Sequence, residues 1–340
     1  MLNCDVKNFI IKMNIGLTYD LRTDYLKEGY SMEETAEFDK EETIVSLEGA
    51  LNNLGHQTER IGHARKLMQE LLAGKRWDIV FNICEGMYGD SRESLVPALL
   101  DAYQVPYVFS GAVILGISLN KAFAKQIIRD AGINTPPFLV VNQPDDVKRC
   151  QLTYPLFAKP IAEGTGKGIE DRSVINTAEQ LAEMCQYLLN KFKQPVLVEE
   201  YLPGREFTVG VVGNGTDARV VGAMEVIYGD GVNDIYSYDN TETYAGRIQD
   251  TPVTGDWLEQ STDISLKAWN TLNANDGGRV DVRVDRYGKI SFIEINPLAG
   301  LNPVHSDLPI LCRMNGIEYP ELIGMIMDAA IKRIRTTNGN

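Results

Sequence analysis

The sequence predicts a multidomain α/β protein, because three features of its 340 residues agree. The length exceeds what one ordinary hydrophobic core supports, so two or three domains are expected. In the first third, apolar strands alternate with amphipathic helices, a pattern typical of a parallel sheet with helices on both faces. The remainder combines Val- and Ile-rich hairpins with further helices, which is typical of α+β domains.

Strands and helices alternate over the first 111 residues. The strands are expected at 13–21, 77–84 and 105–111, and the helices at 41–55 and 94–103, the second helix broken early by Pro97. Ligands of a parallel sheet bind beyond the carboxyl ends of its strands. The loops that start at Thr18 and Cys84 are therefore candidate site segments, with a plain surface loop as the alternative. Glu85, Arg92 and Glu93 cluster beside glycines, which favours a substrate-contacting role for the second loop.

The remaining elements mix helices with antiparallel hairpins. A helix over 119–132 leads to a linker at 133–138, whose two prolines are typical of a hinge between domains. Residues 228–254 are polar, aromatic and turn-rich, and a loop of this length is usually functional or disordered. The other elements are expected to be a strand around Lys159, a helix at 177–192, a strand at 194–204, a hairpin at 206–227, and helices at 257–274 and 319–335.

Charge and composition restrict the function classes. The formal net charge is −14 and no basic stripe is present, which argues against a nucleic-acid partner. Anionic nucleotides are not excluded, since a few local lysines and a metal suffice. No apolar run reaches the roughly 18 residues needed to cross a membrane, and no signal-peptide pattern opens the chain. The five cysteines are scattered, so we expect a reduced, cytoplasmic protein with no membrane partner.

Residues 278–300 carry the most informative pattern, a β-hairpin with two chemically different faces. Val- and Ile-rich runs flank a turn, and a four-residue loop would pair Asp285 with Ile290. Side chains alternate between the two faces of a strand, so one face is expected to be apolar. That face would hold Val280, Val282, Val284, Ile293 and Ile295.

The opposite face of this hairpin is polar. The same register sets Asp281 opposite Glu294 and Arg279 opposite Asn296. Two carboxylates and an amide on one rigid face form an oxygen set suited to Mg²⁺, which takes its remaining ligands from phosphate and water. The neighbouring arginine suits negative charge that develops during phosphoryl or acyl transfer. A solvated hairpin face with ordinary surface charges is the alternative.

A glycine-rich loop is a candidate for phosphate binding. Lys159 on its strand is followed by three glycines around Lys167, and glycines let backbone N–H groups approach phosphate oxygens. The loop is not a Walker A motif, because a glycine follows Lys167 where Ser or Thr is required. An ordinary glycine-rich turn is the alternative.

A strand end near residue 200 is a candidate for nucleoside binding. The segment from Glu199 to Leu202 can present backbone groups to an adenine edge, and Glu206 just beyond can accept ribose hydroxyls. A strand terminus with ordinary salt bridges is the alternative.

The order of these motifs along the chain resembles that of the ATP-grasp superfamily, and within it the D-alanine–D-alanine ligase branch. It runs from a helical lysine, Lys121, through Lys159 and the glycine-rich loop to "EEYLPGREF", and ends with Asp281 and "EIN". The most specific segments are "EFTVGVVG", "GRVDV" and "EIN" followed by "HSDLP", and the resemblance covers the chain from about Met13 onward. It implies a three-domain ATP-grasp fold: an N-terminal α/β domain (1–119), a central α+β domain (120–200) and a C-terminal α+β domain with the metal site (201–340).

The resemblance also implies a reaction and a role for each motif. Family members clamp ATP between the central and C-terminal domains and phosphorylate a carboxylate, and an amine then attacks the acyl phosphate. The ATP-binding residues would be Lys121, Lys159, Thr165, Gly166, Glu199, Leu202 and Glu206. Two Mg²⁺ ions, for which Mn²⁺ is expected to substitute, would be held by Asp281, Glu294 and Asn296. Catalysis would use Arg279, the backbone N–H of Gly300, and Ser306, and the substrate would contact Glu85, Arg92, Glu93 and His305.

The substrate-contacting segments depart from the ligase pattern, whereas the ATP and metal segments keep it. A Gly-Gly-Thr-Ser turn is replaced by "GLTYDLRTDYLKEGY", a His-Gly signature by "CEGMYGDSRES", and the acceptor motif by "NPLAGLNPVHSD". The Lys-Tyr pair of the mobile loop is absent from "YSYDNTETY". Changed pockets argue for a changed substrate, because function follows the site rather than the fold.

We therefore expect an ATP-dependent ligase that phosphorylates an acid oxygen of a small-molecule acceptor and couples it to an amino-acid amine, releasing ADP and phosphate. A concrete candidate is the ligase of mycosporine-like amino acid biosynthesis, which attaches an amino acid to mycosporine-glycine. A true D-alanine–D-alanine ligase of cell-wall synthesis is the first alternative, and a non-catalytic nucleotide-binding protein is the second. Relatives are commonly dimers, so a homodimer is expected.

Overall fold

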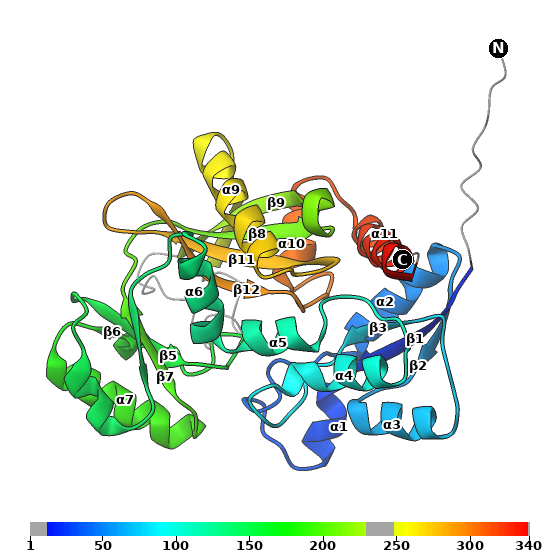
Figure 1. Ribbon diagram of the computed structural model, residues 1–340, viewed down its shortest axis with the longest axis horizontal. Helices are drawn as coiled ribbons and strands as arrows, with labels where there is room; N and C mark the ends of the chain where they lie inside the picture. The colour runs from blue at the N-terminus through cyan, green and yellow to red at the C-terminus, as the bar shows by residue number, and fades with distance from the viewer. Residues whose placement is uncertain (1–11, 229–247, 339–340) are drawn as a thin grey trace.

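The computed structural model describes residues 12–228 and 248–338, and these residues form three β-sheets with helices packed against them. Figure 1 shows an N-terminal unit in blue to cyan, a lobe in green, and, above and between them, a sheet in yellow-green to orange. The last helix, α11 (Tyr319–Asn338), returns to the N-terminal unit, where it packs beside α2 (Glu41–Asn53). Among the described residues, none of the helices combines the length and apolar character that a membrane span requires.

The N-terminal unit contains the predicted parallel sheet. Its strands, in the order β2-β1-β3, are β1 (Asn14–Tyr19), β2 (Gln57–Arg60) and β3 (Ile79–Ile83). The accompanying helices are α1 (Arg22–Lys27), α2, α3 (Ala64–Leu72), α4 (Leu95–Ala102) and α5 (Ala112–Leu119). The loops after β1 and β3 meet at the carboxyl end of the sheet, where the backbone N–H of Gly86 donates to Asp20 at 2.9 Å.

Two expectations for this unit were wrong. Pro97 does not break α4, because it lies in the first turn of the helix, where its missing N–H has no intrahelical acceptor. The strand expected at 105–111 is reduced to an isolated bridge between Val80 and Tyr107. Phe109 adopts a left-handed φ of 76°, and its N–H donates to Asp276 at 2.8 Å, so strand pairing ends there.

The second sheet is four-stranded and lies in the lobe drawn in green. Its strands, in the order β4-β7-β5-β6, are β4 (Phe138–Val141), β5 (Leu156–Pro160), β6 (Val174–Ile175) and β7 (Val196–Glu200). Helix α7 (Ala178–Phe192) begins after Thr177, whose side chain accepts a hydrogen bond from the N–H of Gln180. Its apolar face packs against β5 and β7, as its periodicity predicts.

The third sheet is antiparallel and five-stranded. Its strands, in the order β10-β9-β8-β11-β12, are β8 (Glu206–Val212), β9 (Arg219–Tyr228), β10 (Ile248–Pro252), β11 (Gly277–Val284) and β12 (Ile290–Asn296). One face packs against α6 (Lys121–Asp130) and α9 (Asp256–Thr271), and the other against α10 (Asp307–Met314). The last part of the loop expected at 228–254 contains strand β10. Its portion 229–247 lies outside the described residues.

The β11–β12 hairpin keeps the predicted pairing at its polar end. Asp281 pairs with Glu294, and Arg279 pairs with Asn296. Arg279, the two carboxylates and Asn296 therefore share one face of the sheet, as the alternation of side chains requires.

The turn end of the same hairpin differs from the prediction. Ile290 pairs with Val284 instead of Asp285, because the Asp285 carboxylate accepts the N–H groups of Tyr287 (2.8 Å) and Lys289 (2.9 Å) and is part of the turn. A bulge absorbs the one-residue difference in register. As a consequence, Phe292 packs in the apolar core in place of the expected Ile293, which lines a cavity on the polar face.

Candidate active site

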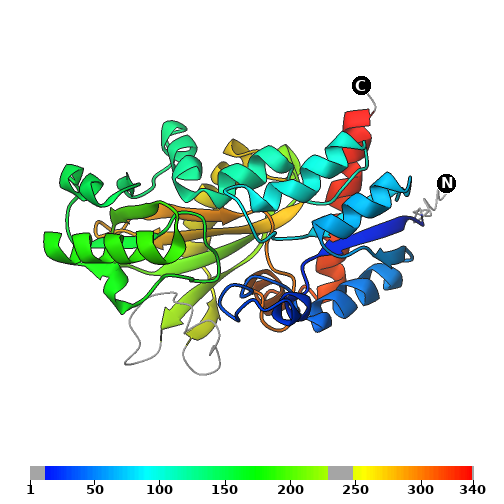
Figure 2. The same cartoon turned by 90° about the horizontal axis from the view of Figure 1, so that it is seen from below.

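Two adjoining cavities lie between the three sheets. The smaller cavity, about 100 Å³, separates the four-stranded from the five-stranded sheet. The larger cavity, about 790 Å³, lies between the N-terminal unit and the segment that follows β12. Figure 2 shows that segment, in orange, beside the dark blue loop after β1. Lys121, Arg279 and Glu294 line both cavities, so the cavities meet at these side chains.

The structure brings all the predicted site residues to one or both cavities. The smaller cavity is lined by Lys121, Lys159, Thr165, Gly166, Glu199, Leu202, Glu206, Arg279, Asp281 and Glu294. The larger cavity is lined by Glu85, Arg92, Glu93, Asn296, Gly300, His305 and Ser306.

A buried ion cluster borders the smaller cavity. The Nζ of Lys159 lies 3.5 Å from a carboxylate oxygen of Glu199 and 3.5 Å from one of Glu294. Lys121 places its Nζ 3.8 Å from Glu294. Lys125, which the sequence analysis missed, has a side chain with 0% exposure and lies 3.0 Å from Glu199. Lys125 follows Lys121 by four residues and so lies on the same face of a helix. This spacing was the signal in the sequence that could have identified it.

The cluster favours the charged forms of Glu294, Glu199 and Lys159, whereas burial lowers the pKa of Lys125. Burial disfavours the charge on Glu294, but Lys121 and Lys159 outweigh burial and lower its pKa to about 2. The pKa of Glu199 is lowered in the same way, against burial, by Lys125 and Lys159. Burial opposes the charge of Lys159 as well, yet the two glutamates raise its pKa. The smaller cavity therefore presents a charged lysine that could bind an anion.

Replacing Lys125 by methionine is expected to destabilise the fold. The substitution removes a fully buried cation and leaves Glu199 with less compensation for its charge, which should cost about 3–5 kcal/mol of unfolding free energy. Urea unfolding of both proteins measures the difference. Lys148→Met, which removes an exposed pair with Asp145, is the control and should change stability by less than about 0.5 kcal/mol. Equal stabilities of the wild type and Lys125→Met would show that the ion pair is not structural.

The polar end of the hairpin has a donor set that fits a hard cation. Thr208 donates to one oxygen of Asp281 at 3.0 Å, and Arg279 forms an ion pair with the other. The Nδ2 of Asn296 lies 3.3 Å from that second oxygen. Burial raises the pKa of Asp281 to about 7, against the charge of Arg279, and the nearby Glu294 adds to the rise.

A divalent cation would relieve this repulsion between carboxylates. Two carboxylates and an amide oxygen suit Mg²⁺ with its other ligands taken from a substrate and water. In the part of the chain that the structure describes, no three His, Cys, Asp or Glu side chains converge as metal ligands would, and the donor set here consists of two carboxylates and the amide of Asn296.

The strand-end residues are fixed by a further ion pair. Arg283 of β11 lies 3.0 Å from Glu206, the first residue of β8, and 3.3 Å from the hydroxyl of Tyr201. Leu202 lies two residues beyond the end of β7 and is buried beside the same cavity. Leu202 and Glu206 therefore line one cavity, which is the arrangement that the predicted nucleoside site requires.

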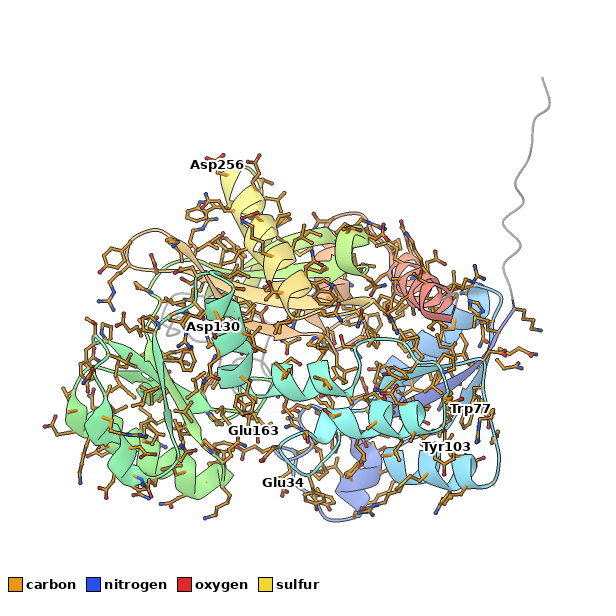
Figure 3. All side chains as sticks on the ribbon, in the orientation of Figure 1. Glu34, Trp77, Tyr103, Asp130, Glu163 and Asp256 are labelled. Atoms are coloured by element: carbon orange, nitrogen blue, oxygen red, sulfur yellow. The ribbon has the colours of Figure 1, made fainter. Side chains whose placement is uncertain are left out.

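The glycine-rich loop is tied to the N-terminal unit by Glu37, which the sequence analysis also missed. Its carboxylate accepts the N–H of Gly164 at 2.9 Å and pairs with Lys167 at 2.9 Å and Arg92 at 2.5 Å. Burial opposes the charge on Glu37, but these two cations lower its pKa to about 2. Lys167, expected to add charge for phosphate binding, is thus engaged by Glu37 and by Glu163, which Figure 3 labels between the lobe and the N-terminal unit.

The segment after β12 shapes the far wall of the larger cavity. The backbone N–H of Asn302 donates to the Ser306 hydroxyl at 3.0 Å, and the Asn302 side chain donates to Thr43 of α2 at 3.0 Å. A Cβ on Gly300 would lie 2.7 Å from that hydroxyl, so a glycine is needed for this close approach. His305 is exposed at the rim of the cavity.

Comparison with known proteins is consistent with this geometry. A family model described as "D-ala D-ala ligase C-terminus" matches residues 127–328. The chain is 31% identical over 281 residues to a D-alanine–D-alanine ligase of Aquifex aeolicus, which covers 82% of this chain and 91% of the relative. A solved D-alanine–D-alanine ligase from Bacillus anthracis has a TM-score of 0.73 at 21% identity, over 96% of this chain and 99% of that one. The VanG D-Ala:D-Ser ligase of Enterococcus faecalis has a TM-score of 0.72 at 16% identity, over 94% and 99%.

Proposed function

Because this chain belongs to the D-alanine–D-alanine ligase family, we propose that it is an ATP-dependent ligase that joins an acid of a small-molecule acceptor to the amine of an amino acid. The observation that carries the proposal is the meeting of Lys121, Arg279 and Glu294 at the junction of the two cavities. The smaller cavity would take ATP and the larger cavity the two substrates, so that a phosphoryl group could pass between them. The three-domain division at 120 and 201 and a homodimeric assembly belong to the same proposal.

The nucleotide would be held by the residues around the smaller cavity. Lys121 and Lys159 would bind the phosphates, with Thr165 and Gly166 of the glycine-rich loop above them. The carboxylate of Glu199 and the backbone of Leu202 would contact adenine, and Glu206 the ribose. The ion cluster supports these roles, because it keeps Lys159 charged beside a cavity that an anion can enter.

Asp281, Glu294 and Asn296 would hold two Mg²⁺ ions, and Mn²⁺ would be able to replace them. When bound, the metal neutralises charge on the transferred phosphoryl group. The chain itself supplies the positions of the ligands, which the pairing of β11 with β12 and the hydrogen bond from Thr208 to Asp281 fix.

Arg279, the backbone N–H of Gly300 and Ser306 would stabilise the charge that develops on the acceptor. The γ-phosphoryl group of ATP transfers to an acid oxygen, which gives an acyl phosphate and ADP. The amine then attacks the acyl carbon, and the resulting tetrahedral intermediate expels phosphate while the amine loses a proton. Donors that are already in place suit this oxyanion, because they need no reorganisation during the reaction.

The acceptor that we propose is mycosporine-glycine. The segments that depart from the ligase pattern, around Glu85 and around His305, both line the larger cavity, so the departure lies where the substrates would bind. In this reaction the phosphorylated group would be a vinylogous acid oxygen. The alternative is ligation of two D-alanines, which the name of the Aquifex aeolicus relative favours.

Coupled measurement of ADP release tests the proposal. The wild-type chain with ATP and Mg²⁺ is assayed with D-alanine alone, and with mycosporine-glycine plus each common amino acid. Release that requires both the acceptor and an amino acid supports the proposed acceptor. Release with D-alanine alone supports the alternative, and the absence of release with every pair would overturn the ligase function.

Lys159→Ala should weaken ATP binding by about 10- to 100-fold, since a buried charge that faces the phosphates is lost. Isothermal titration calorimetry with a non-hydrolysable ATP analogue measures the affinity. Lys148→Ala, at an exposed position of the same lobe that pairs with the equally exposed Asp145, is the control and should bind the analogue like the wild type. An unchanged affinity in Lys159→Ala would contradict the role given to this lysine.

A further inference from the structure

Two glutamates of the larger cavity, Glu85 and Glu93, are expected to contact a substrate but take no part in the phosphoryl and acyl transfer described above. Glu85 follows β3, and Glu93 lies in the turn of 3₁₀-helix that precedes α4. Both side chains are surrounded by protein but remain partly exposed. The exposed part of each side chain faces the cavity that both residues line. Within residues 12–228 and 248–338, neither carboxylate takes part in a hydrogen bond or an ion pair.

The nearest protein cations are engaged elsewhere. Arg92, between the two glutamates in the sequence, directs one nitrogen to Glu37 at 2.5 Å and another to the carbonyl oxygen of Ala162 at 2.8 Å. Lys121 donates to the carbonyl oxygen of Glu163 at 2.6 Å. The wall that holds Glu85 and Glu93 therefore carries more negative charge than its own cations compensate.

This imbalance is unfavourable in the absence of a ligand. Burial raises the pKa of Glu93 to about 7, against the charge of Arg92. Burial also raises the pKa of Glu85, and repulsion from Glu93 adds to the rise. A cation that entered the cavity would stabilise the charged forms of both carboxylates, because each would then have an opposite charge beside it.

We propose, on the basis of the ligase function above, that Glu85 and Glu93 bind the cationic side-chain end of a basic amino-acid substrate. In this proposal the reacting end of the substrates lies at Arg279, Gly300 and Ser306, which line the same cavity, and the cationic group is a second one, distinct from the amine that is joined. The volume of about 790 Å³ accommodates an amino acid with a long side chain beside an acceptor. An ammonium group satisfies one or both carboxylates, and a guanidinium group has enough donors for both.

Paired substrates of equal size and different charge test this inference. ADP release is measured with arginine against citrulline and with lysine against norleucine, each as both enantiomers, with mycosporine-glycine or D-alanine as the acceptor. The basic member of a pair is expected to have a kcat/KM higher by at least about tenfold. Glu85→Gln and Glu93→Gln should each reduce that preference while the KM for ATP stays unchanged. Asp90→Asn, an exposed position of the same loop, is the control and should keep the preference.

The outcomes separate this inference from the proposed function. ADP release that ignores side-chain charge, in the wild type and in both variants, would overturn the inference and leave the ligase function standing. If no pair releases ADP, isothermal titration calorimetry measures the affinity of the chain for arginine and for citrulline and so tests the inference directly. Tighter binding of arginine that is lost in Glu93→Gln supports the inference, and equal or absent binding of the two overturns it. A preference for lysine over arginine, or the reverse, identifies the cation as ammonium or guanidinium.

Discussion

Glu294→Gln is expected to reduce ligase turnover by about 1,000-fold while the chain stays folded, because the variant loses a metal-binding charge without losing side-chain volume. Glu294 pairs with Asp281 across the hairpin and lies 3.5 Å from Lys159, so it serves both the cation site and the phosphate site. Asp281→Asn should have a similar effect, because it also loses a metal-binding charge without losing side-chain volume. Initial rates of ADP release at saturating ATP, measured over a range of Mg²⁺ concentrations, give the loss.

Two controls make this result interpretable. Glu225→Gln makes the same substitution on the same sheet, at a residue that pairs with Arg205 outside both cavities, and should leave turnover unchanged. Circular dichroism and the urea midpoint should agree between the variants and the wild type. Near-normal rates in Glu294→Gln or Asp281→Asn at ordinary Mg²⁺ concentrations would show that the metal assignment is wrong.

Arg279→Lys is expected to lower kcat by about 100-fold with little change in the KM for ATP, because lysine keeps the charge and loses the planar set of donors. Arg279 forms an ion pair with Asp281 and lies 3.5 Å from Asp307, so the two carboxylates fix its guanidinium at the junction of the cavities. A group that acts on charge developed in the transition state affects kcat more than ground-state binding.

The comparison of kcat with KM distinguishes this role from a structural one. Single-turnover measurement of phosphate release separates the chemical step from product release. Arg205→Lys, at a partly exposed position whose partner is Glu225, is the matched control and should retain full activity. A proportional loss of ATP affinity, or an unchanged kcat, would contradict a transition-state role for Arg279.

Local sequence patterns were sufficient for much of the fold. The parallel sheet, α7, α9, and the β8–β9 and β11–β12 hairpins follow from apolar periodicity and turn residues, and the solved relatives confirm the predicted ATP-grasp fold. β2, over residues 57–60, was missed because it is a polar edge strand without an apolar alternation. α5, over residues 112–119, was missed because it is apolar on nearly all sides and has no helical period.

Features that depend on tertiary contacts were not predictable in the same way. The bulge in β12 follows from Asp285 taking part in the turn, and alternation alone placed Ile293 on the wrong face. Lys125 and Glu37 are important only because folding buries them beside partners far away in the sequence. Glu85, Arg92 and Glu93 could be proposed from their strand end, but which of them lacks a partner required the structure.

The central claim is that the β11–β12 hairpin holds divalent cations against the phosphates of ATP. Crystals grown with a non-hydrolysable ATP analogue and Mn²⁺ test it most directly, because Mn²⁺ gives an anomalous scattering signal at its own position. We predict anomalous peaks in contact with Asp281, Glu294 and Asn296, with Lys121 and Lys159 turned to the phosphates. Bound nucleotide with no anomalous peak at these side chains, and with Asp281 and Glu294 still paired only to Arg279, Lys121 and Lys159, would contradict the account.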